Sequence, residues 1–415
     1  MKFLLRTHGC RANQYDSEAV RAMLLSGGLS EVADAQLADI AIFNSCSVTA
    51  AAEAELRKDI RRASRLNPRL QTIVMGCAPG VATRDERGAS LRTLPTVTHA
   101  IAGADLDLVA SAIGLPREAA RFPRGSQTGA RGLLRIQDGC DEHCTFCATT
   151  MARGANRSRS VAELTVEAAA LAEVHPEIVL TGIHIGSYGT DTGDSLSSLV
   201  DALVLNVPRV RFRLSSLEAT EVDDRLRELV SEGTRLAPYL HAPLQSGSDR
   251  VLRRMGRSWY SRASYESHVM EIVGARSVFG LGADIICGFP GETEEDHHLT
   301  VAVVERLPFT SLHVFPYSPR PGTASLRLPD HVGSPVIDRR TTELRELAMR
   351  KSTAYRASRA GGRADVVAIS PREGLTEDYL PVAITASTVR RRDRFEATLA
   401  ANENGLTAVP IVTQR

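Results

Sequence analysis

A strand–helix rhythm that repeats six times after residue 132 constrains the fold of this chain more than any other feature. Short apolar runs alternate there with longer helical patterns, which predicts an α/β domain with parallel strands. Six consecutive units predict a partial (β/α)6 barrel, whose functional groups should lie at the carboxyl ends of its strands. The expected strands are Leu133–Gln137, Ile178–Gly182, Val210–Ser215, Tyr239–Leu244, Gly282–Gly288 and Leu312–Tyr317. The expected helices are Val161–Val174, Leu196–Val204, Asp223–Ser231, Tyr260–Val278 and Glu294–Leu307.

The first of these strands ends directly at three cysteines, Cys140, Cys144 and Cys147, in the spacing C-x3-C-x2-C. Soft thiolates select iron–sulfur clusters, zinc or copper(I). A four-iron cluster normally takes four cysteines, so three ligands would leave one iron open to a substrate or cofactor. An open metal position indicates chemistry rather than architecture, by the logic that separates catalytic from structural zinc sites.

Three further cysteines, Cys10, Cys46 and Cys77, share one local context near the start of the chain. Each follows an apolar, strand-like run, and helical patterns lie between the runs, so this part predicts a small parallel sheet. In open α/β sheets ligands gather at the carboxyl edge of the strands, so these three thiols could meet at one point. The runs are Phe3–Arg6, Ala38–Asn44 and Gln71–Met75, and the helical patterns are Ser17–Ser26 and Ala50–Leu66.

Composition limits the remaining possibilities. The 415 residues predict about three domains, and a net charge of +1 gives no overall attraction to nucleic acid. No apolar run approaches the ~18 residues that span a bilayer, so the chain is expected in the cytoplasm and away from membranes. Thiols stay reduced there, which makes the seven cysteines better candidates for metal ligands than for disulfides. Cys287 is the exception, because it lies inside an apolar strand and is expected in the core.

The tail of the chain has a different pattern. A basic helix is expected over Arg339–Arg363, followed by strand-like runs separated by turn residues, which is typical of a small β-barrel. Arg117–Arg131 is expected to be an exposed linker. The predicted domains are therefore 1–116, 126–357 and 358–415. The tail runs are Asp365–Ile369, Tyr379–Ile384, Arg394–Leu399 and Thr407–Val412.

With these motifs in place, the chain resembles a radical S-adenosylmethionine (SAM) methylthiotransferase. The cysteine run and the following Met151–Gly154 resemble the radical SAM signature. The segments Thr7–Tyr15, Asn44–Thr49 and Gly76–Cys77 resemble the three cysteine motifs of the family's amino-terminal domain. The tail segment Gly374–Val382 is similar to the TRAM domain, a small RNA-binding barrel.

Three other segments resemble one branch of this family, which modifies N6-threonylcarbamoyladenosine in tRNA beside the anticodon. They are Thr181–Gly189, Leu214–Glu221 and His313–Thr323. The partners that this resemblance implies are tRNA and an electron donor such as flavodoxin or ferredoxin. Basic groups expected to contact RNA phosphates are the helix from Arg57 to Arg65, the Arg153–Arg159 cluster and the basic helix before the tail.

The resemblance implies two four-iron clusters and SAM as cofactors. The cluster on Cys140, Cys144 and Cys147 would bind SAM and cleave it to a 5′-deoxyadenosyl radical, which removes a hydrogen from an unactivated C–H bond. The cluster on Cys10, Cys46 and Cys77 would present the sulfur that is methylated and joined to the substrate carbon. The residues expected to contact SAM or the substrate are Phe146, Thr181, Gly182, Ser216, Glu218 and Gln245.

Two alternatives stay open from the sequence. One keeps the chemistry and places the methylthio group on a protein or peptide side chain. The other is a non-enzymatic iron–sulfur or zinc regulator, which would bind metal without cleaving SAM. The single Trp259 is expected to pack against the core or an interface, and His143 and His184 are expected to be ordinary loop histidines.

Overall fold

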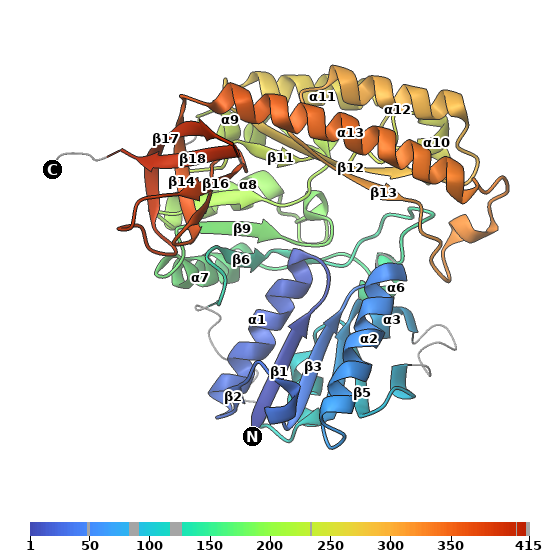
Figure 1. The fold of residues 1–415 in the computed structure, drawn as a ribbon, viewed down its shortest axis with the longest axis vertical. Coiled ribbons are helices and arrows are strands. Elements are labelled where there is room, and N and C mark those ends of the chain that lie inside the picture. The colour runs from blue at the N-terminus through green and yellow to red at the C-terminus, as the bar shows by residue number, and fades with distance from the viewer. Residues whose placement is uncertain (48–49, 83–90, 117–126, 233–234, 404, 412–415) are drawn as a thin grey trace.

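Three sheets organise the computed structural model, which describes residues 1–47, 50–82, 91–116, 127–232, 235–403 and 405–411. They are a parallel sheet near the N-terminus, a curved central sheet and a closed C-terminal barrel (Figure 1). The predicted linker over Arg117–Arg131 lies outside the described residues as far as residue 126. No helix in the described ranges combines the length and the apolar character that crossing a membrane requires.

The N-terminal sheet has five parallel strands in the order β2-β1-β3-β4-β5. Phe3 shares an apolar cluster with Met23 on one face, whereas Leu4 shares another with Ile60 on the opposite face. Helices therefore bury both faces, as parallel sheets require. The strands are β1 (Lys2–Thr7), β2 (Ser30–Glu31), β3 (Ile40–Ser45), β4 (Gln71–Gly76) and β5 (Val97–Ala102). The helices are α1 (Arg11–Ser26), η1 (Ala35–Leu37), α2 (Ala50–Leu66), α3 (Cys77–Ala82) and α5 (Leu106–Ala112).

The three predicted strands and both predicted helices of this part are present, but the sequence pattern missed β2 and β5. The strand β2 has only two residues, and most residues of β5 are exposed or half-exposed, so neither has an apolar pattern to detect. The helix α1 begins at Arg11, six residues earlier than predicted, so that Cys10 is its N-cap residue.

The central sheet is the predicted partial barrel of six parallel strands. It consists of two halves, β6-β9-β10 and β11-β12-β13, which parallel bridges join at Phe212–Leu236 and Ser216–His241. A short antiparallel pair, β7 and β8, brackets the loop that carries the second set of cysteines. The strands are β6 (Gly132–Arg135), β7 (Gln137–Asp138), β8 (Arg157–Ser158), β9 (Glu177–Thr181), β10 (Arg211–Leu214), β11 (Tyr239–His241), β12 (Gly280–Cys287) and β13 (Ser311–Pro316).

Helices cover the outer face of this sheet, which Figure 1 shows for α11, α12 and α13 above β12 and β13. Ile285 and Val314 lie in the same core cluster as Leu344 of α13, and Cys287 is buried there as predicted. The helices of this part are α6 (Thr149–Arg153), α7 (Val161–Ala172), η3 (Ile185–Ser187), α8 (Leu196–Asn206), η4 (Ala219–Glu221), α9 (Asp224–Glu232), α10 (Asp249–Arg254), α11 (Arg262–Gly274), α12 (Glu294–Arg306), η5 (Ala324–Arg327) and α13 (Ser334–Arg359).

The C-terminal barrel closes in the order β14-β15-β16-β18-β17, which leaves no open sheet edge. Its interior is apolar and includes Val366, Val382 and Leu399. The four predicted runs correspond to four of the strands, and the three-residue β15 was missed because it is too short to show a pattern. The strands are β14 (Arg363–Ser370), β15 (Glu373–Leu375), β16 (Pro381–Ile384), β17 (Arg394–Asn402) and β18 (Gly405–Pro410).

A buried carboxylate fixes this barrel to the central sheet. Glu177 is fully buried and accepts hydrogen bonds from Nε of Arg211 at 2.6 Å and Nε of Arg213 at 2.9 Å. Arg211 also donates to the backbone oxygen of Asp365 in β14 at 2.7 Å. Burial alone would raise the pKa of Glu177, but the neighbouring guanidinium groups hold it well below its usual range. The joint therefore contains a fully ionised carboxylate at ordinary pH.

Tyr379 joins all three parts of the molecule. Its ring stacks on Tyr239 of β11 with centroids 4.6 Å apart, and its hydroxyl accepts a hydrogen bond from Arg11 of α1 at 2.5 Å. The backbone of Tyr379 has φ of 72°, which is uncommon for a bulky residue and points to a position fixed by its surroundings. The start of α1, next to Cys10, is thereby held against the central sheet and the C-terminal barrel.

Candidate functional site

The three N-terminal cysteines lie at one edge of the N-terminal sheet, as their strand-end positions predicted. Cys10 caps α1 after β1, Cys46 follows β3, and Cys77 begins α3 directly after β4. The side-chain oxygen of Asn13 lies 3.8 Å from Sγ of Cys10 and 3.9 Å from Sγ of Cys77. Cys10 is exposed, whereas the other two are buried, so this first triad opens to solvent on one side.

Buried amides and a glycine set the geometry of the first triad. Asn13 donates to the backbone oxygens of His8 at 2.9 Å and Ser45 at 2.8 Å, which ties together the loops after β1 and β3. Gly9 has φ of 109°, and a Cβ at this position would lie 2.7 Å from Cβ of Cys46. Only glycine permits both this backbone conformation and this close approach.

The second triad, Cys140, Cys144 and Cys147, lies in one loop after β7. The backbone N–H of Cys147 donates to the carbonyl of Cys144 at 3.1 Å, and the N–H of Thr149 donates to Sγ of Cys147 at 3.3 Å. All three cysteines are half-buried. A local turn, rather than long-range packing, therefore brings these thiols together.

Each triad has one buried arginine that connects a thiol to a carboxylate. In the first triad Nε of Arg153 lies 3.4 Å from Sγ of Cys77, and the same guanidinium is 2.9 Å from Asp16. Its NH2 group also donates to the side-chain oxygen of Asn13 at 2.7 Å. Burial raises the pKa of the Cys77 thiol to about 11, and the Arg153 cation opposes that rise. Such a cation favours the thiolate form that ligates metal.

Arg257 has the equivalent place in the second triad. Its NH1 group lies 3.3 Å from Sγ of Cys144, and its NH2 group forms an ion pair with Glu218. Burial raises the pKa of the Cys144 thiol to about 12, and the Arg257 cation again opposes the rise. On the other side of the loop, Nδ1 of His184 lies 3.8 Å from Sγ of Cys140 while its Nε2 meets Glu221 at 2.7 Å.

The helices α3 and α6 bring the two triads together. The helix α3 begins at Cys77, and α6 begins two residues after Cys147 and ends at Arg153, which bonds to Cys77. The two helices pack so closely that a Cβ on Gly80 would lie 2.5 Å from the carbonyl oxygen of Ala152. At 1.5 Å per residue, the five residues of α6 span only about 7 Å. The two sets of thiols are therefore neighbours in the fold.

Of the residues predicted to contact SAM, five lie at the end of a strand of the central sheet or just after it. Thr181 is buried at the end of β9, and a Cβ on Gly182 would lie 2.8 Å from the side-chain oxygen of Gln137. Ser216 is exposed and pairs with His241 by a parallel bridge. Gln245 is half-buried with φ of 63°, and it pairs with Ile285 of β12. These four line the carboxyl ends of the strands, on the side of the cysteine loop.

Glu218 and Phe146 have protein partners that the sequence did not suggest. One oxygen of Glu218 pairs with Arg257, and the other accepts a hydrogen bond from Nε1 of Trp259 at 2.6 Å. The Glu218 carboxylate therefore acts through Arg257, which also stacks over the Trp259 ring at 4.8 Å. The ring of Phe146 packs edge-on against Phe289, with centroids 6.3 Å apart. A role for its backbone is still a prediction.

Two expectations about single residues need correction. Trp259 was expected only to pack, but its indole N–H holds Glu218 in place beside the second triad. His184 was expected to be an ordinary loop histidine, but it connects Cys140 to Glu221. No signal in the sequence identifies Arg257 or Trp259, because their partners come from distant parts of the chain, whereas Asn13 lies inside the Thr7–Tyr15 motif.

The basic patches are also less available for RNA than the sequence suggested. The side chain of Arg153 is 1% exposed and serves the first triad instead. In α13, Arg340 pairs with Glu292 and Arg359 pairs with Asp378, and both are buried. Exposed basic residues remain in all three patches: Lys58, Arg61, Arg62 and Arg65 on α2, Arg157 after α6, and Arg339, Arg345 and Arg350 on α13.

The donor chemistry of both triads fits iron–sulfur clusters. Each triad offers three thiols, so a four-iron cluster bound there would have one iron without a cysteine ligand. Each also has a buried cation against one sulfur, which suits a bound group that carries negative charge. In the first triad Cys10 is exposed, whereas Cys46 and Cys77 are buried.

Comparison with known proteins gives a consistent picture. The family model described as "Radical SAM superfamily" matches residues 134–303, and the one described as "Uncharacterized protein family UPF0004" matches residues 2–96. The chain is 32% identical over 397 residues to "Threonylcarbamoyladenosine tRNA methylthiotransferase MtaB" of Aquifex aeolicus, covering 92% of this chain and 96% of that protein.

It is also 30% identical over 401 residues to "tRNA-2-methylthio-N(6)-dimethylallyladenosine synthase" of Bartonella tribocorum, covering 89% of this chain and 86% of that one. Among solved structures, the chain resembles the radical S-adenosylmethionine methyltransferase TsrM from Kitasatospora setae, with a TM-score of 0.58 and 14% identity. That likeness covers 78% of this chain and 76% of the other, and it concerns the fold alone.

Proposed function

The chain belongs to the radical SAM methylthiotransferases, and from this premise we propose that it places a methylthio group on N6-threonylcarbamoyladenosine in a tRNA. The names of the relatives support a tRNA, but relatives of both kinds have similar identity, 32% and 30%. The support for the threonylcarbamoyl group comes from the segments Thr181–Gly189, Leu214–Glu221 and His313–Thr323, which resemble that branch.

The packing of α3 on α6 is the observation that carries the methylthiotransferase function. It packs α3, which begins at Cys77, against α6, which begins two residues after Cys147, and Arg153 at the end of α6 bonds to Cys77. A chain that only generated a radical would need one set of thiols. Holding a reacting group in the right geometry can raise its effective concentration to about 10⁵ M or more. Two sites held close together are therefore well suited to act on the same substrate atom.

In the proposed reaction Cys10, Cys46 and Cys77 hold one cluster and Cys140, Cys144 and Cys147 hold the other. When bound, the clusters and SAM supply the radical that removes a hydrogen and the methylated sulfur that replaces it. The protein positions these groups. Arg153 and Arg257 orient Cys77 and Cys144, and Asn13 joins the loops of the first triad.

The strand ends of the central sheet complete the proposed site. Thr181, Gly182, Ser216 and Gln245 lie where SAM would reach the second triad, and Glu218 keeps Arg257 in place. We place the reaction in the cytoplasm, with tRNA as substrate and with an electron donor such as flavodoxin or ferredoxin.

An anaerobic reaction with reductant, SAM and defined RNAs tests the proposal. The reconstituted protein is given three anticodon stem-loops, which carry N6-threonylcarbamoyladenosine, N6-dimethylallyladenosine or unmodified adenosine. We expect the methylthio product on the first RNA only, together with methionine and 5′-deoxyadenosine. Product on the dimethylallyl RNA alone would contradict the proposed substrate while keeping the chemistry.

A parallel measurement in cells checks the biological substrate. The nucleosides of total tRNA are compared by mass spectrometry in strains with and without the gene, and we expect the methylthio nucleoside to disappear in the deletion strain. Unchanged tRNA nucleosides, with SAM cleavage intact in the reconstituted protein, would instead favour a peptide substrate.

A further inference from the structure

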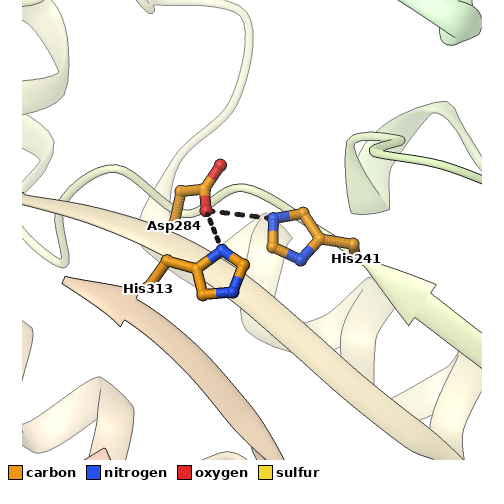
Figure 2. Close-up of side chains that lie close together, drawn as sticks. All are labelled: His241, Asp284 and His313. Atoms are coloured by element: carbon orange, nitrogen blue, oxygen red, sulfur yellow. Dashed lines mark hydrogen bonds and ion pairs between the residues drawn. The ribbon is translucent and has the colours of Figure 1, made fainter. Parts of the chain in front are cut away.

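Three polar side chains converge on the central sheet outside both triads. His241 lies on β11, Asp284 on β12 and His313 on β13, three neighbouring strands (Figure 2). One carboxylate oxygen of Asp284 lies 3.1 Å from Nε2 of His241 and 3.2 Å from Nδ1 of His313. Figure 2 shows the carboxylate between the two imidazole rings. His313 opens the segment His313–Thr323 that resembles one branch of the family, but none of the three was expected in a site.

The cluster lies on the inner face of the sheet. Side chains alternate between the two faces of a strand, and Ile285 and Val314 lie in the core with helix α13. Asp284 and His313 therefore point to the opposite face. The imidazole of His313 is 63% exposed, whereas that of His241 is 10% exposed, so the cluster opens toward solvent at His313.

Its charges favour an anion. The hydrogen bond that His313 donates to Asp284 raises the pKa of His313, although burial opposes this, so the imidazolium form is favoured. With Nδ1 donating to Asp284, no described residue takes the hydrogen of Nε2, which is left for a ligand. Arg11 brings a second positive charge to this face, because it donates to the Tyr379 hydroxyl at 2.5 Å and the Tyr379 ring stacks on Tyr239, two residues from His241 on β11. A metal ion bound by the same three groups is the alternative occupant, and metal analysis of the holoenzyme separates the two.

The cluster also lies beside both parts of the proposed site. The N–H of Gln245 donates to the backbone oxygen of Asp284 at 2.8 Å, and the N–H of Leu217 donates to that of His241 at 2.9 Å. These contacts place the cluster just inside the strand ends where SAM is expected. From the other direction, Arg11 follows Cys10 of the first triad.

We propose that His313, together with Arg11, binds the carboxylate of the threonyl group of the substrate. Asp284 and His241 are positioning residues that hold the His313 ring. This inference rests on the proposed function and deepens it, because a threonylcarbamoyl group carries a free carboxylate and a dimethylallyl group is a hydrocarbon. The site would therefore select the first modification over the second, since an ionic hydrogen bond that one substrate cannot make discriminates strongly.

The test uses stem-loops that differ only in this charge. The reconstituted holoenzyme is assayed with the threonylcarbamoyl stem-loop and with its methyl ester, which removes the negative charge and keeps the shape. For the unaltered protein we expect the ester to raise KM by about 10- to 100-fold with a smaller change in kcat, as loss of a hydrogen bond to a charged group would. Equal KM values for acid and ester would overturn the proposal without the need for any variant.

Variants then assign the effect to the cluster. His313→Gln should raise KM for the acid by a similar factor and leave KM for the ester close to that of the unaltered protein. Asp284→Asn should also raise KM for the acid. His298→Gln alters an exposed histidine of α12 that pairs with Glu294. It is the matched control and should leave KM unchanged for both the acid and the ester. Equal losses on acid and ester in His313→Gln would overturn the proposal.

Two other outcomes have distinct meanings. If the unaltered protein modifies only the dimethylallyl stem-loop, the proposed function fails, and the carboxylate site fails with it. If it modifies the threonylcarbamoyl stem-loop but treats acid and ester alike, only the carboxylate site fails. One equivalent of a metal other than iron that is present in the holoenzyme and lost in Asp284→Asn would also overturn it, in favour of a metal site.

Discussion

The two cysteine triads reach similar surroundings by different routes. Cys140, Cys144 and Cys147 lie within eight residues, and a local turn gathers them. Cys10, Cys46 and Cys77 come from three strand ends across 68 residues, and only the folded sheet brings them together. Yet each triad has one buried arginine between a thiol and a carboxylate. The short motif supplies the ligands of one site, whereas the tertiary fold supplies the ligands of the other and the cations of both.

The largest expected effect separates the two triads by function. Cys144→Ala should abolish formation of both 5′-deoxyadenosine and the methylthio product, because it removes a ligand from the site proposed to bind SAM. Cys77→Ala should abolish only the methylthio product and keep SAM cleavage. Both products are measured by mass spectrometry after an anaerobic reaction. Cys287→Ala, at a buried cysteine outside both triads, is the control and should keep both activities. Loss of SAM cleavage in Cys77→Ala would contradict the division of labour.

The two buried arginines test the same division of labour at side chains that contact the thiols. Arg153→Gln should lower the yield of methylthio product, and Arg257→Gln should lower SAM cleavage, each by about 10- to 100-fold, as is typical of residues that orient metal ligands. Iron content per chain is measured alongside. Arg225→Gln, at a side chain of α9 that is 44% exposed and pairs with Asp201, is the control and should have little effect on either product. If Arg153→Gln and Arg257→Gln had the same effect on both products, the two cations would not serve separate sites.

The contact between α3 and α6 can be broken without touching any ligand. Gly80→Ala places a methyl group against the backbone of Ala152, so the helices must separate. Such overpacking costs about 1–3 kcal/mol in the free energy of unfolding. We expect less methylthio product per SAM cleaved, because the triads move apart. Denaturant unfolding and product ratios measure the two effects. Gly274→Ala in α11 meets nothing within 4 Å and is the matched control.

The smallest expected effect concerns pH. The hydrogen bond to Asp284 raises the pKa of His313, so this pair stabilises the fold fully below the ordinary histidine pKa of about 6.5 and loses its contribution as pH rises through the raised value. His241 and Arg11 are the other ionisable groups near this imidazole. Because His313 is largely exposed, the effect should stay below about 1 kcal/mol.

Urea unfolding of the unaltered protein and of His313→Gln, from about pH 6 to about pH 9, checks this prediction. The difference between the two free energies of unfolding should shrink toward the alkaline end. A constant difference over the whole range would show that His313 contributes by packing and not by charge.

The sequence predicted those features that repeat or that lie close together. Strand–helix alternation gave the six-stranded partial barrel and the N-terminal sheet, since apolar periodicity depends only on local order. The meeting of Cys10, Cys46 and Cys77 was predictable because the carboxyl ends of parallel strands share one edge. The strand β5 was not predictable, because its mostly exposed residues have no apolar pattern.

The environment of the thiols could not be predicted, because its members come from distant positions. Arg153 stands 76 residues from Cys77, and Arg257 stands 113 residues from Cys144. In the sequence alone, Arg153 belongs to a basic cluster that suggested RNA, and only the fold shows that it is buried against Asp16. His241, Asp284 and His313 were missed for the same reason, since three strands must pair before their side chains meet.

The hydrogen bond between Arg11 and Tyr379 joins residues that are 368 positions apart. At about 5–20 residues per second, roughly 20 to 70 seconds of translation separate the synthesis of the two partners. The remainder of the N-terminal sheet and the whole central sheet are synthesised within that interval, while this joint cannot yet form. Biogenesis therefore has a fixed order, in which both triads are complete as polypeptide before the three parts of the molecule are locked together at Tyr379.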